Sequence, residues 1–223
     1  MTADVLTAGS PLASAAGAVV LLHGRGAGPE DMLGLAEALG RPDLAFLAPQ
    51  APGRTWYPYS FLAPLADNEP ALTQALARVD ATVADLGRAG FSPERIVLAG
   101  FSQGACLALE YAARHARRYG GVAALSGGLI GPKGTARDYA GSLAGTPLFI
   151  GCGDRDGHIP LWRVQESTGV LEGLGAEVAE RIYPGMGHTV NDDEIRHVRA
   201  LLAGLPAAGG ERRSAIGIDS ANG

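Results

Sequence analysis

One serine in this sequence lies in a pattern that could present it as a nucleophile. Ser102 is the centre of Gly100-Phe101-Ser102-Gln103-Gly104, between the apolar run Ile96–Ala99 and a helical stretch that starts near Ala105. The two glycines leave space for a sharp strand-to-helix turn that would lift the hydroxyl into a cleft at the positive end of a helix. A Gly-rich turn with an N-capping serine is the alternative, and the strand-to-helix context favours the nucleophile. Ser126 also follows an apolar run, but the glycines after it indicate a structural turn.

A serine nucleophile needs a base, and the base needs an acid that fixes its tautomer. In folds that carry this turn, the chain order is serine, acid, histidine. His188 lies in the Gly-rich stretch 183–189, after the last apolar run and before the last helical one, which is the expected place for the base. His158 is the alternative base. It shares a short loop with Asp156, which leaves little room for the histidine to face the serine with the acid behind it. If it is not the base, we expect it to line the wall of the cleft. The remaining histidines are poorly placed: His23, His115 and His197.

The acid is expected in the loop that follows Leu148–Ile150. Two carboxylates stand there, Asp154 and Asp156. Asp156 lies further beyond the strand end and is followed by Ile159-Pro160, a proline suited to the first position of a helix. The spacing favours Asp156 as the acid, while Asp154 suits a turn or an ion pair with Arg155.

The tetrahedral intermediate of acyl transfer carries an oxyanion, which two backbone N–H groups can bind. The amide that follows the nucleophile, that of Gln103, is the first candidate. The second is the Arg25 amide, in the Gly-rich stretch 23–28 after the first apolar run. The alternatives for this stretch are a plain connection or a phosphate cradle, but the Gly-Lys-Ser/Thr ending of a P-loop is absent.

Several of the chain's few aromatic residues gather in the segment 54–61, at the expected ligand-binding edge of the sheet. They are Trp56, Tyr57, Tyr59 and Phe61. This segment could form an acyl or aryl pocket or a small lid, or it could pack on top of the sheet. We expect the substrate pocket to be lined by Trp56, Tyr57, Phe101 and Met186.

The elements that must position these residues alternate regularly. Short apolar runs begin near residues 18, 44, 96, 122, 148 and 178, and helical stretches occupy about 29–39, 70–89, 103–118, 160–174 and 192–203. This alternation predicts an α/β fold with a mainly parallel sheet and helices on both faces. Ligands bind such sheets beyond the carboxyl ends of the strands, where the loops above lie. Residues 1–16 are expected to form an arm or edge strand, 17–204 the domain, and 205–223 a flexible tail.

Composition excludes several classes of function. The 223 residues carry a net charge of −5, which disfavours nucleic acid and anionic lipid as partners. With 47% hydrophobic and 18% charged residues the chain is too apolar for general disorder, yet no stretch is long enough to span a bilayer. Cys106 and Cys152 are expected to be reduced, buried thiols outside any metal cluster. No Lys or Arg precedes Arg25, so a secretory signal is not expected and a cytoplasmic location is.

Together these pieces resemble the carboxylesterase/phospholipase family of small serine hydrolases, which includes acyl-protein thioesterases. The matching residues are Leu22-His23-Gly24-Arg25-Gly26, Gly100-Phe101-Ser102-Gln103-Gly104, Gly153-x-x-Asp156-x-x-Ile159-Pro160 and Tyr183-x-Gly185-x-x-His188. The resemblance implies an α/β-hydrolase fold without a separate cap domain and a triad of Ser102, Asp156 and His188, with Asp156 as the acid. It also implies hydrolysis of small or medium acyl or aryl esters without metal or cofactor, and a possible homodimer.

The segment after the second apolar run departs from one branch of that family. Acyl-protein thioesterases carry a Trp-Phe-Asp sequence there, whereas this chain has Trp56-Tyr57-Pro58-Tyr59-Ser60-Phe61, which is more similar to bacterial carboxylesterases of the family. The alternatives to an esterase are a thioesterase or lysophospholipase, an acyltransferase or perhydrolase with the same triad, and, from another class, a ligand receptor that has kept only the fold.

Overall fold

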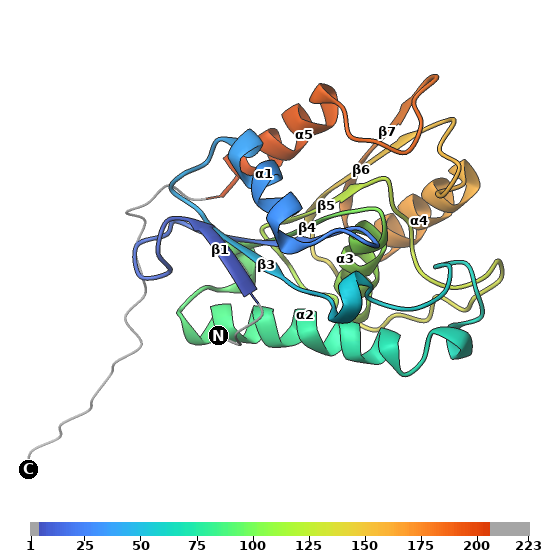
Figure 1. Ribbon diagram of the computed structural model, residues 1–223, viewed down its shortest axis with the longest axis horizontal. Helices are drawn as coiled ribbons and strands as arrows, with labels where there is room; N and C mark the ends of the chain where they lie inside the picture. Colours follow the sequence, from blue (N-terminus) through green and yellow to red (C-terminus); the bar gives the residue numbers. More distant parts are fainter. Residues whose placement is uncertain (1–4, 206–223) are drawn as a thin grey trace, which may run out of the picture.

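The computed structural model describes residues 5–205, which form a seven-stranded sheet between helices (Figure 1). The strand order is β1-β3-β2-β4-β5-β6-β7; β1 runs antiparallel to β3, and the other neighbours are parallel. The strands are β1 (Val5–Gly9), β2 (Ala18–Leu22), β3 (Ala45–Pro49), β4 (Ile96–Phe101), β5 (Gly121–Leu125), β6 (Pro147–Gly153) and β7 (Glu177–Tyr183). The α-helices are α1 (Pro29–Leu39), α2 (Ala71–Arg88), α3 (Gln103–Arg114), α4 (Leu161–Gly173) and α5 (Asp192–Ala203), with short 3₁₀ helices at Pro52–Arg54, Leu65–Asn68 and Pro93–Arg95.

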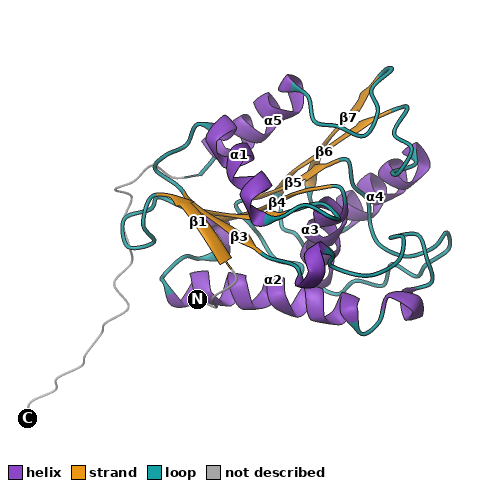
Figure 2. Cartoon of the chain, viewed as in Figure 1, coloured by secondary structure: helices purple, strands orange, loops and turns teal. Residues whose placement is uncertain are grey.

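The central strands are apolar throughout because both faces of the sheet are covered (Figure 2). Along β2, Val20 and Leu22 pack in one core with residues of α2, α3 and α4, while Val19 and Leu21 pack in the other with residues of α1 and α5. This alternation is the two-residue period of a strand. The predicted α/β architecture, a mainly parallel sheet with helices on both faces, is therefore confirmed.

The two ends of the described chain both belong to the folded domain. Val5–Gly9 pairs with β3, so the segment before residue 17 contributes an edge strand to the sheet. At the other end Leu205 is buried in the core, and the rest of the expected tail, 206–223, lies outside the described residues. The third helix was expected to reach residue 118 but ends at Arg114, because His115 leaves the helical conformation with φ −117° and ψ 47°.

Two glycines allow β4, α3 and β2 to approach one another closely. A Cβ atom added to Gly104 would lie 2.0 Å from the carbonyl oxygen of Leu22, and one added to Gly100 would lie 2.4 Å from the carbonyl carbon of Gly104. Real side chains do not tolerate such contacts, so the backbones would have to separate. The turn that carries Ser102 thus depends on glycine at both positions for space.

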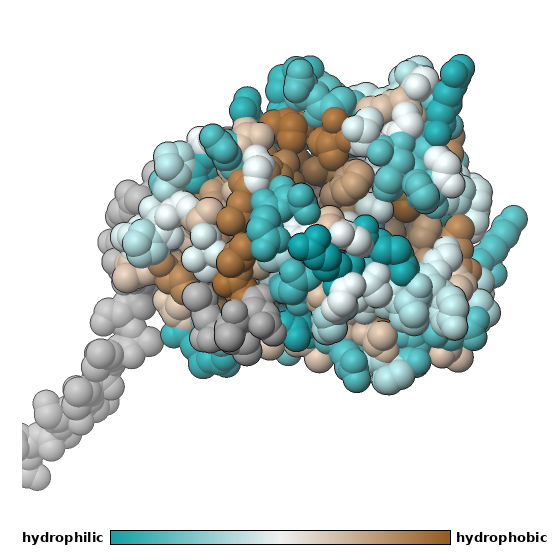
Figure 3. Space-filling model, in the orientation of Figure 1, coloured by the Kyte–Doolittle hydropathy of each residue, from teal (hydrophilic) through white to brown (hydrophobic). Residues whose placement is uncertain are grey.

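No helix within residues 5–205 is long and apolar enough to cross a membrane. On the face shown in Figure 3, apolar side chains form separate patches among polar ones. Such an alternation of small patches is ordinary for the surface of a globular domain.

Gly104→Ala should lower the free energy of unfolding by about 3 kcal/mol, since the new methyl group forces α3 away from β2. Gly34→Ala is the matched control. Gly34 lies inside α1, and an added Cβ would have no atom within 4 Å, so this change should raise stability by about 0.5–1 kcal/mol. Urea unfolding of both variants measures the two effects, and equal effects would contradict the argument from close approach.

Candidate active site

Ser102 occupies a strained position between β4 and α3. Its φ is 55° and its ψ −118°, values that non-glycine residues rarely adopt and that cost of order 1–3 kcal/mol. The surroundings hold it there: Ser102 N donates to Leu125 O on β5 at 2.9 Å, and Ser102 O accepts from Cys106 N on α3 at 3.0 Å. The turn directs the hydroxyl out of the sheet at the N-terminal end of α3.

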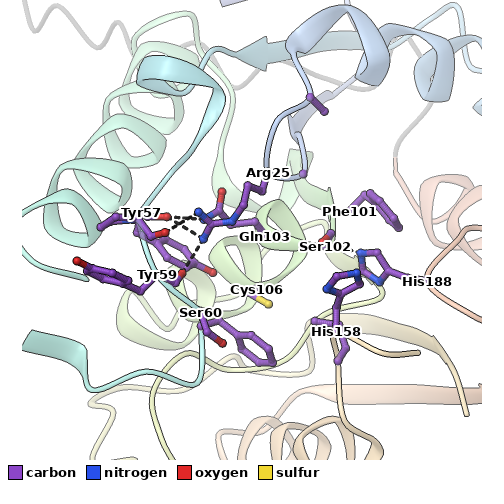
Figure 4. A pocket seen from close by; sticks show the side chains of 15 residues that line it. Arg25, Tyr57, Tyr59, Ser60, Phe101, Ser102, Gln103, Cys106, His158 and His188 are labelled. Carbon is purple, nitrogen blue, oxygen red and sulfur yellow. Dashed lines mark hydrogen bonds between the residues drawn. The ribbon is translucent and has the colours of Figure 1, made fainter. Parts of the chain in front are cut away.

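The histidine favoured from the sequence contacts this serine, and the favoured acid contacts the far side of the histidine ring. His188 Nε2 lies 2.8 Å from Ser102 Oγ, and Figure 4 shows the two side chains next to each other. On the other side of the ring, His188 Nδ1 lies 2.7 Å from Asp156 Oδ2. The carboxylate therefore favours a proton on Nδ1, which leaves Nε2 as the acceptor for the serine proton. The ring is also packed against Phe101, with ring centroids 4.9 Å apart.

Asp156 is held as an ionised carboxylate. Its Oδ1 accepts the backbone N–H groups of His158 at 2.8 Å and Ile159 at 3.0 Å. Burial alone would raise the pKa of this carboxyl, but the hydrogen bonds from His188 and the two amides outweigh it, and the pKa lies below the ordinary value of 3.8. Asp156 can thus stabilise a positive charge on His188.

Asp154 and His158, the alternative acid and base, make other contacts. Asp154 Oδ1 accepts the Gly185 amide at 2.6 Å, so this carboxylate orders the turn that leads to His188. His158 lines the cavity beside His188, with ring centroids 4.7 Å apart, while the hydrogen bond to Ser102 comes from His188.

Two backbone amides near Ser102 suit an oxyanion site. Gln103 is the first residue of α3, so its N–H has no carbonyl partner within the helix. In the loop after β2, Gly26 N donates to Arg54 O and Ala27 N to Gly24 O, whereas the Arg25 amide has no partner among the described residues. This loop lies against the nucleophile, since a Cβ on Gly24 would be 3.4 Å from Ser102 Cβ.

The side chains of these two residues hold the aromatic segment. Arg25 donates to the carbonyl oxygens of Tyr57, Pro58 and Tyr59, at 2.9, 2.7 and 2.6 Å. The Gln103 side chain accepts from Trp56 N at 3.0 Å and donates to Tyr57 O at 2.8 Å. These contacts could not be predicted from the sequence, because a single Arg and a single Gln distant from the segment give no local signal.

A buried histidine supports the same loop from below. His23 is fully buried, with Nδ1 2.8 Å from Gly24 O and Nε2 accepting from Ala51 N at 3.1 Å. Burial lowers its pKa, and both ring nitrogens are satisfied in the neutral form. Its own carbonyl accepts the indole N–H of Trp56 at 2.8 Å.

A cavity of about 460 Å³ opens beside Ser102. Of the residues expected to line it, Tyr57 and Phe101 do so, together with Arg25, Tyr59, Phe61, Cys106, His158 and His188. Trp56 and Met186 do not. The indole of Trp56 packs against His23 and is 2% exposed, and the Met186 sulfur accepts a hydrogen bond from the Asn191 side chain at 3.0 Å.

Both cysteines are buried and unbridged, as expected. Burial raises the pKa of Cys106 and of Cys152 to about 12, so both thiols are protonated at neutral pH and are poor nucleophiles. Within residues 5–205 there is no cluster of three or more His, Cys, Asp or Glu side chains placed to hold a metal ion.

Glu194, near the start of α5, is a further buried carboxyl that sequence analysis missed. Its Oε2 accepts from Asn191 N at 2.8 Å, and Asn191 Oδ1 accepts from Glu194 N at 2.9 Å, a capping box that fixes the chain after His188. The other oxygen is buried against Gly151 without a hydrogen bond among the described residues. The Asn-x-x-Glu spacing before a helical stretch is the sequence signal from which this capping box could have been predicted.

Comparisons with known proteins agree on one family. The model of the phospholipase/carboxylesterase family matches residues 5–205. A phospholipase/carboxylesterase structure from Dyadobacter fermentans has a TM-score of 0.87 and 46% identity, and the match covers 90% of this chain and 96% of that chain. A probable carboxylesterase of Oryza sativa subsp. japonica is 28% identical over 87% of this chain and 90% of its own length. An acyl-protein thioesterase 1 of Gibberella zeae is 38% identical, but over 51% of this chain and 49% of its own.

The buried carboxyl of Glu194 predicts a pH-dependent stability. Burial raises its pKa from 4.5 to about 7, so between these values the folded chain holds a proton that the unfolded chain releases, and stability falls as pH rises. Glu194→Gln should therefore be more stable than the unaltered chain above pH 7, by up to about 3 kcal/mol. Urea unfolding at pH 4 and pH 8 tests this. An advantage that is equal at both values would contradict it.

Proposed function

The chain belongs to the phospholipase/carboxylesterase family, and from that premise we propose that it hydrolyses carboxylic esters through an acyl-enzyme on Ser102. The observation that carries the proposal is the continuous hydrogen-bonded path from Ser102 Oγ to His188 to Asp156, at 2.8 and 2.7 Å. A serine, a histidine and a carboxylate in this order form the arrangement needed to activate a hydroxyl at neutral pH.

In the first half of the proposed reaction, Ser102 Oγ attacks the ester carbonyl carbon while His188 Nε2 takes the hydroxyl proton. The carbonyl oxygen becomes an oxyanion, which the Gln103 and Arg25 amides bind. Collapse of the intermediate breaks the bond to the alcohol oxygen, and His188 returns its proton to that oxygen. The products are a free alcohol and an acyl group on Ser102.

In the second half, water takes the place of the alcohol. His188 removes a proton from the water as it attacks the acyl carbon, the same amides bind the new oxyanion, and the proton returns to Ser102 Oγ as the acid leaves. In both halves the Asp156 carboxylate stabilises the imidazolium form of His188. Its lowered pKa keeps this charge available at neutral pH.

Thioester hydrolysis is the second candidate. It is favoured by the match to the Gibberella zeae protein, whose name is acyl-protein thioesterase 1. The same steps apply, with a thiol in place of the alcohol as the leaving group. Transfer of the acyl group to an acceptor other than water, a cytoplasmic location and pairing into a homodimer stay predictions.

His188→Ala should lower kcat/KM for p-nitrophenyl esters by about 10⁴-fold or more, because the serine loses its base. His158→Ala should change it by less than about tenfold, because the cavity loses one wall but keeps the triad. Steady-state kinetics on both variants measure the difference.

Labelling with a fluorophosphonate probe supplies the control. The unaltered chain should be labelled at Ser102, and Ser102→Ala should not be labelled. If the folded, unaltered protein takes up no probe at Ser102, the serine-hydrolase proposal is wrong. If His158→Ala is the variant that loses activity, the assignment of the base is wrong.

A further inference from the structure

The loop that carries His188 is held by contacts near both of its ends. It runs from the end of β7 to the start of α5 (Figure 1). Near its start, Arg155 N donates to Met186 O at 3.0 Å, which ties it to the loop after β6. Near its end, Asn191 Nδ2 donates to the Met186 sulfur at 3.0 Å, and Asn191 N donates to Glu194 Oε2. The place of the proposed base therefore depends on what fixes Asn191.

The two oxygens of the Glu194 carboxyl lie against two different segments of the chain. Oε2 accepts from Asn191 N at 2.8 Å, at the end of the loop that carries His188. Oε1 lies against Gly151 in β6, where a Cβ atom added to the glycine would be 2.3 Å from it. The Glu194 side chain is fully buried between them. One carboxyl thus connects the loop of the proposed base to the strand that leads to Asp156.

The surroundings of this carboxyl favour its uncharged form. Oε1 has no hydrogen bond among the described residues, and no cation there interacts with Glu194. The titratable groups that do interact with it are two carboxylates, a thiol and a phenol: Asp156 after β6, Asp193 on α5, Cys152 on β6 and Tyr183 at the end of β7. A buried charge without a counter-charge is unfavourable, and burial raises the pKa of Glu194 to about 7. Above this pH the carboxylate must take up water or leave its place beside β6.

We propose that Glu194 is a positioning residue of the proposed triad, whose carboxyl holds the His188 loop against β6 so that the imidazole reaches both the serine and the acid. Glu194 does not line the cavity and acts through Asn191. Because the charged form cannot keep this place, hydrolysis should lose part of its rate as the carboxyl ionises. The inference rests on the proposed function and adds a residue on which the geometry of its base depends.

Two variants separate the position of the carboxyl from its charge. Glu194→Gln keeps an acceptor for Asn191 N and cannot ionise, whereas Glu194→Ala loses the acceptor. At pH 6, kcat for p-nitrophenyl butyrate should stay within about twofold in Glu194→Gln and fall roughly tenfold in Glu194→Ala, with a smaller change in KM, because a displaced base transfers the proton less well. Each kcat is expressed per serine labelled by a fluorophosphonate probe, so a lower folded fraction does not imitate the effect.

The pH dependence of kcat distinguishes this role from a purely structural one. The ratio of kcat in Glu194→Gln to kcat in the unaltered chain should rise at least about threefold between pH 6 and pH 8.5, because only the unaltered chain ionises at this position. Titration of the base is common to both proteins and cancels in the ratio. Asp192→Asn is the matched control, since it removes an exposed carboxylate from the same turn of α5, and its ratio should stay constant.

A ratio for Glu194→Gln that does not change with pH would overturn the inference, and so would a Glu194→Ala chain with an unaltered kcat per labelled serine. If Glu194→Ala does not fold, the ratio for Glu194→Gln decides alone. Hydrolysis by the unaltered chain that depends on Ser102 tests the proposed function separately, so this inference can fail while the esterase proposal stands. If the unaltered chain does not hydrolyse the ester, both fail.

Discussion

The geometry of this site depends on the close approach of three backbone segments. Gly104 at the start of α3 lies against the Leu22 carbonyl at the end of β2, and Gly100 at the end of β4 lies against Gly104. Only glycine fits at both positions, because a Cβ atom at either one would clash with the backbone. The approach imposes a φ of 55° on Ser102, and the hydrogen bond to Leu125 O holds that strain in place. The proposed nucleophile is thus positioned by packing in the centre of the sheet.

The same approach places the proposed oxyanion site. Because β2 and α3 are in contact, the loop after β2, which contains Arg25, lies beside Ser102 and the first turn of α3, which begins at Gln103. Their side chains reach in another direction and bind the backbone of the aromatic segment. The cavity and the proposed oxyanion donors are therefore connected through Arg25 and Gln103, so a change in residues 55–59 should alter the position of these two amides. Such preorganisation of polar groups is the main source of stabilisation for a developing charge.

Much of this fold could be predicted from the sequence because its strongest signals are local. The apolar run Ile96–Ala99, the glycines around Ser102 and the Gly-rich stretch before His188 each mark a strand end, and parallel strands bring such ends to one edge. The residues of the proposed triad could be chosen from that edge by order and spacing, and the structure places them within hydrogen-bond distance of one another in series. What could not be predicted is the direction of loop side chains. Trp56 turns down onto His23 and Met186 turns toward Asn191, since each satisfies a contact that is distant in the sequence or set by the turn.

The most direct test of the account is the mass of the protein during turnover. The chain would be mixed with p-nitrophenyl acetate, quenched in acid within the first turnover, and digested to locate any added acyl group. We expect one acetyl group per chain, on the peptide that contains Ser102, and we expect it to disappear as the substrate is consumed. Ser126 also has a positive φ, 54°, at the end of a strand, but it is fully buried. Release of p-nitrophenol with the acyl group on Ser126, or with no acyl group on Ser102, would contradict the account.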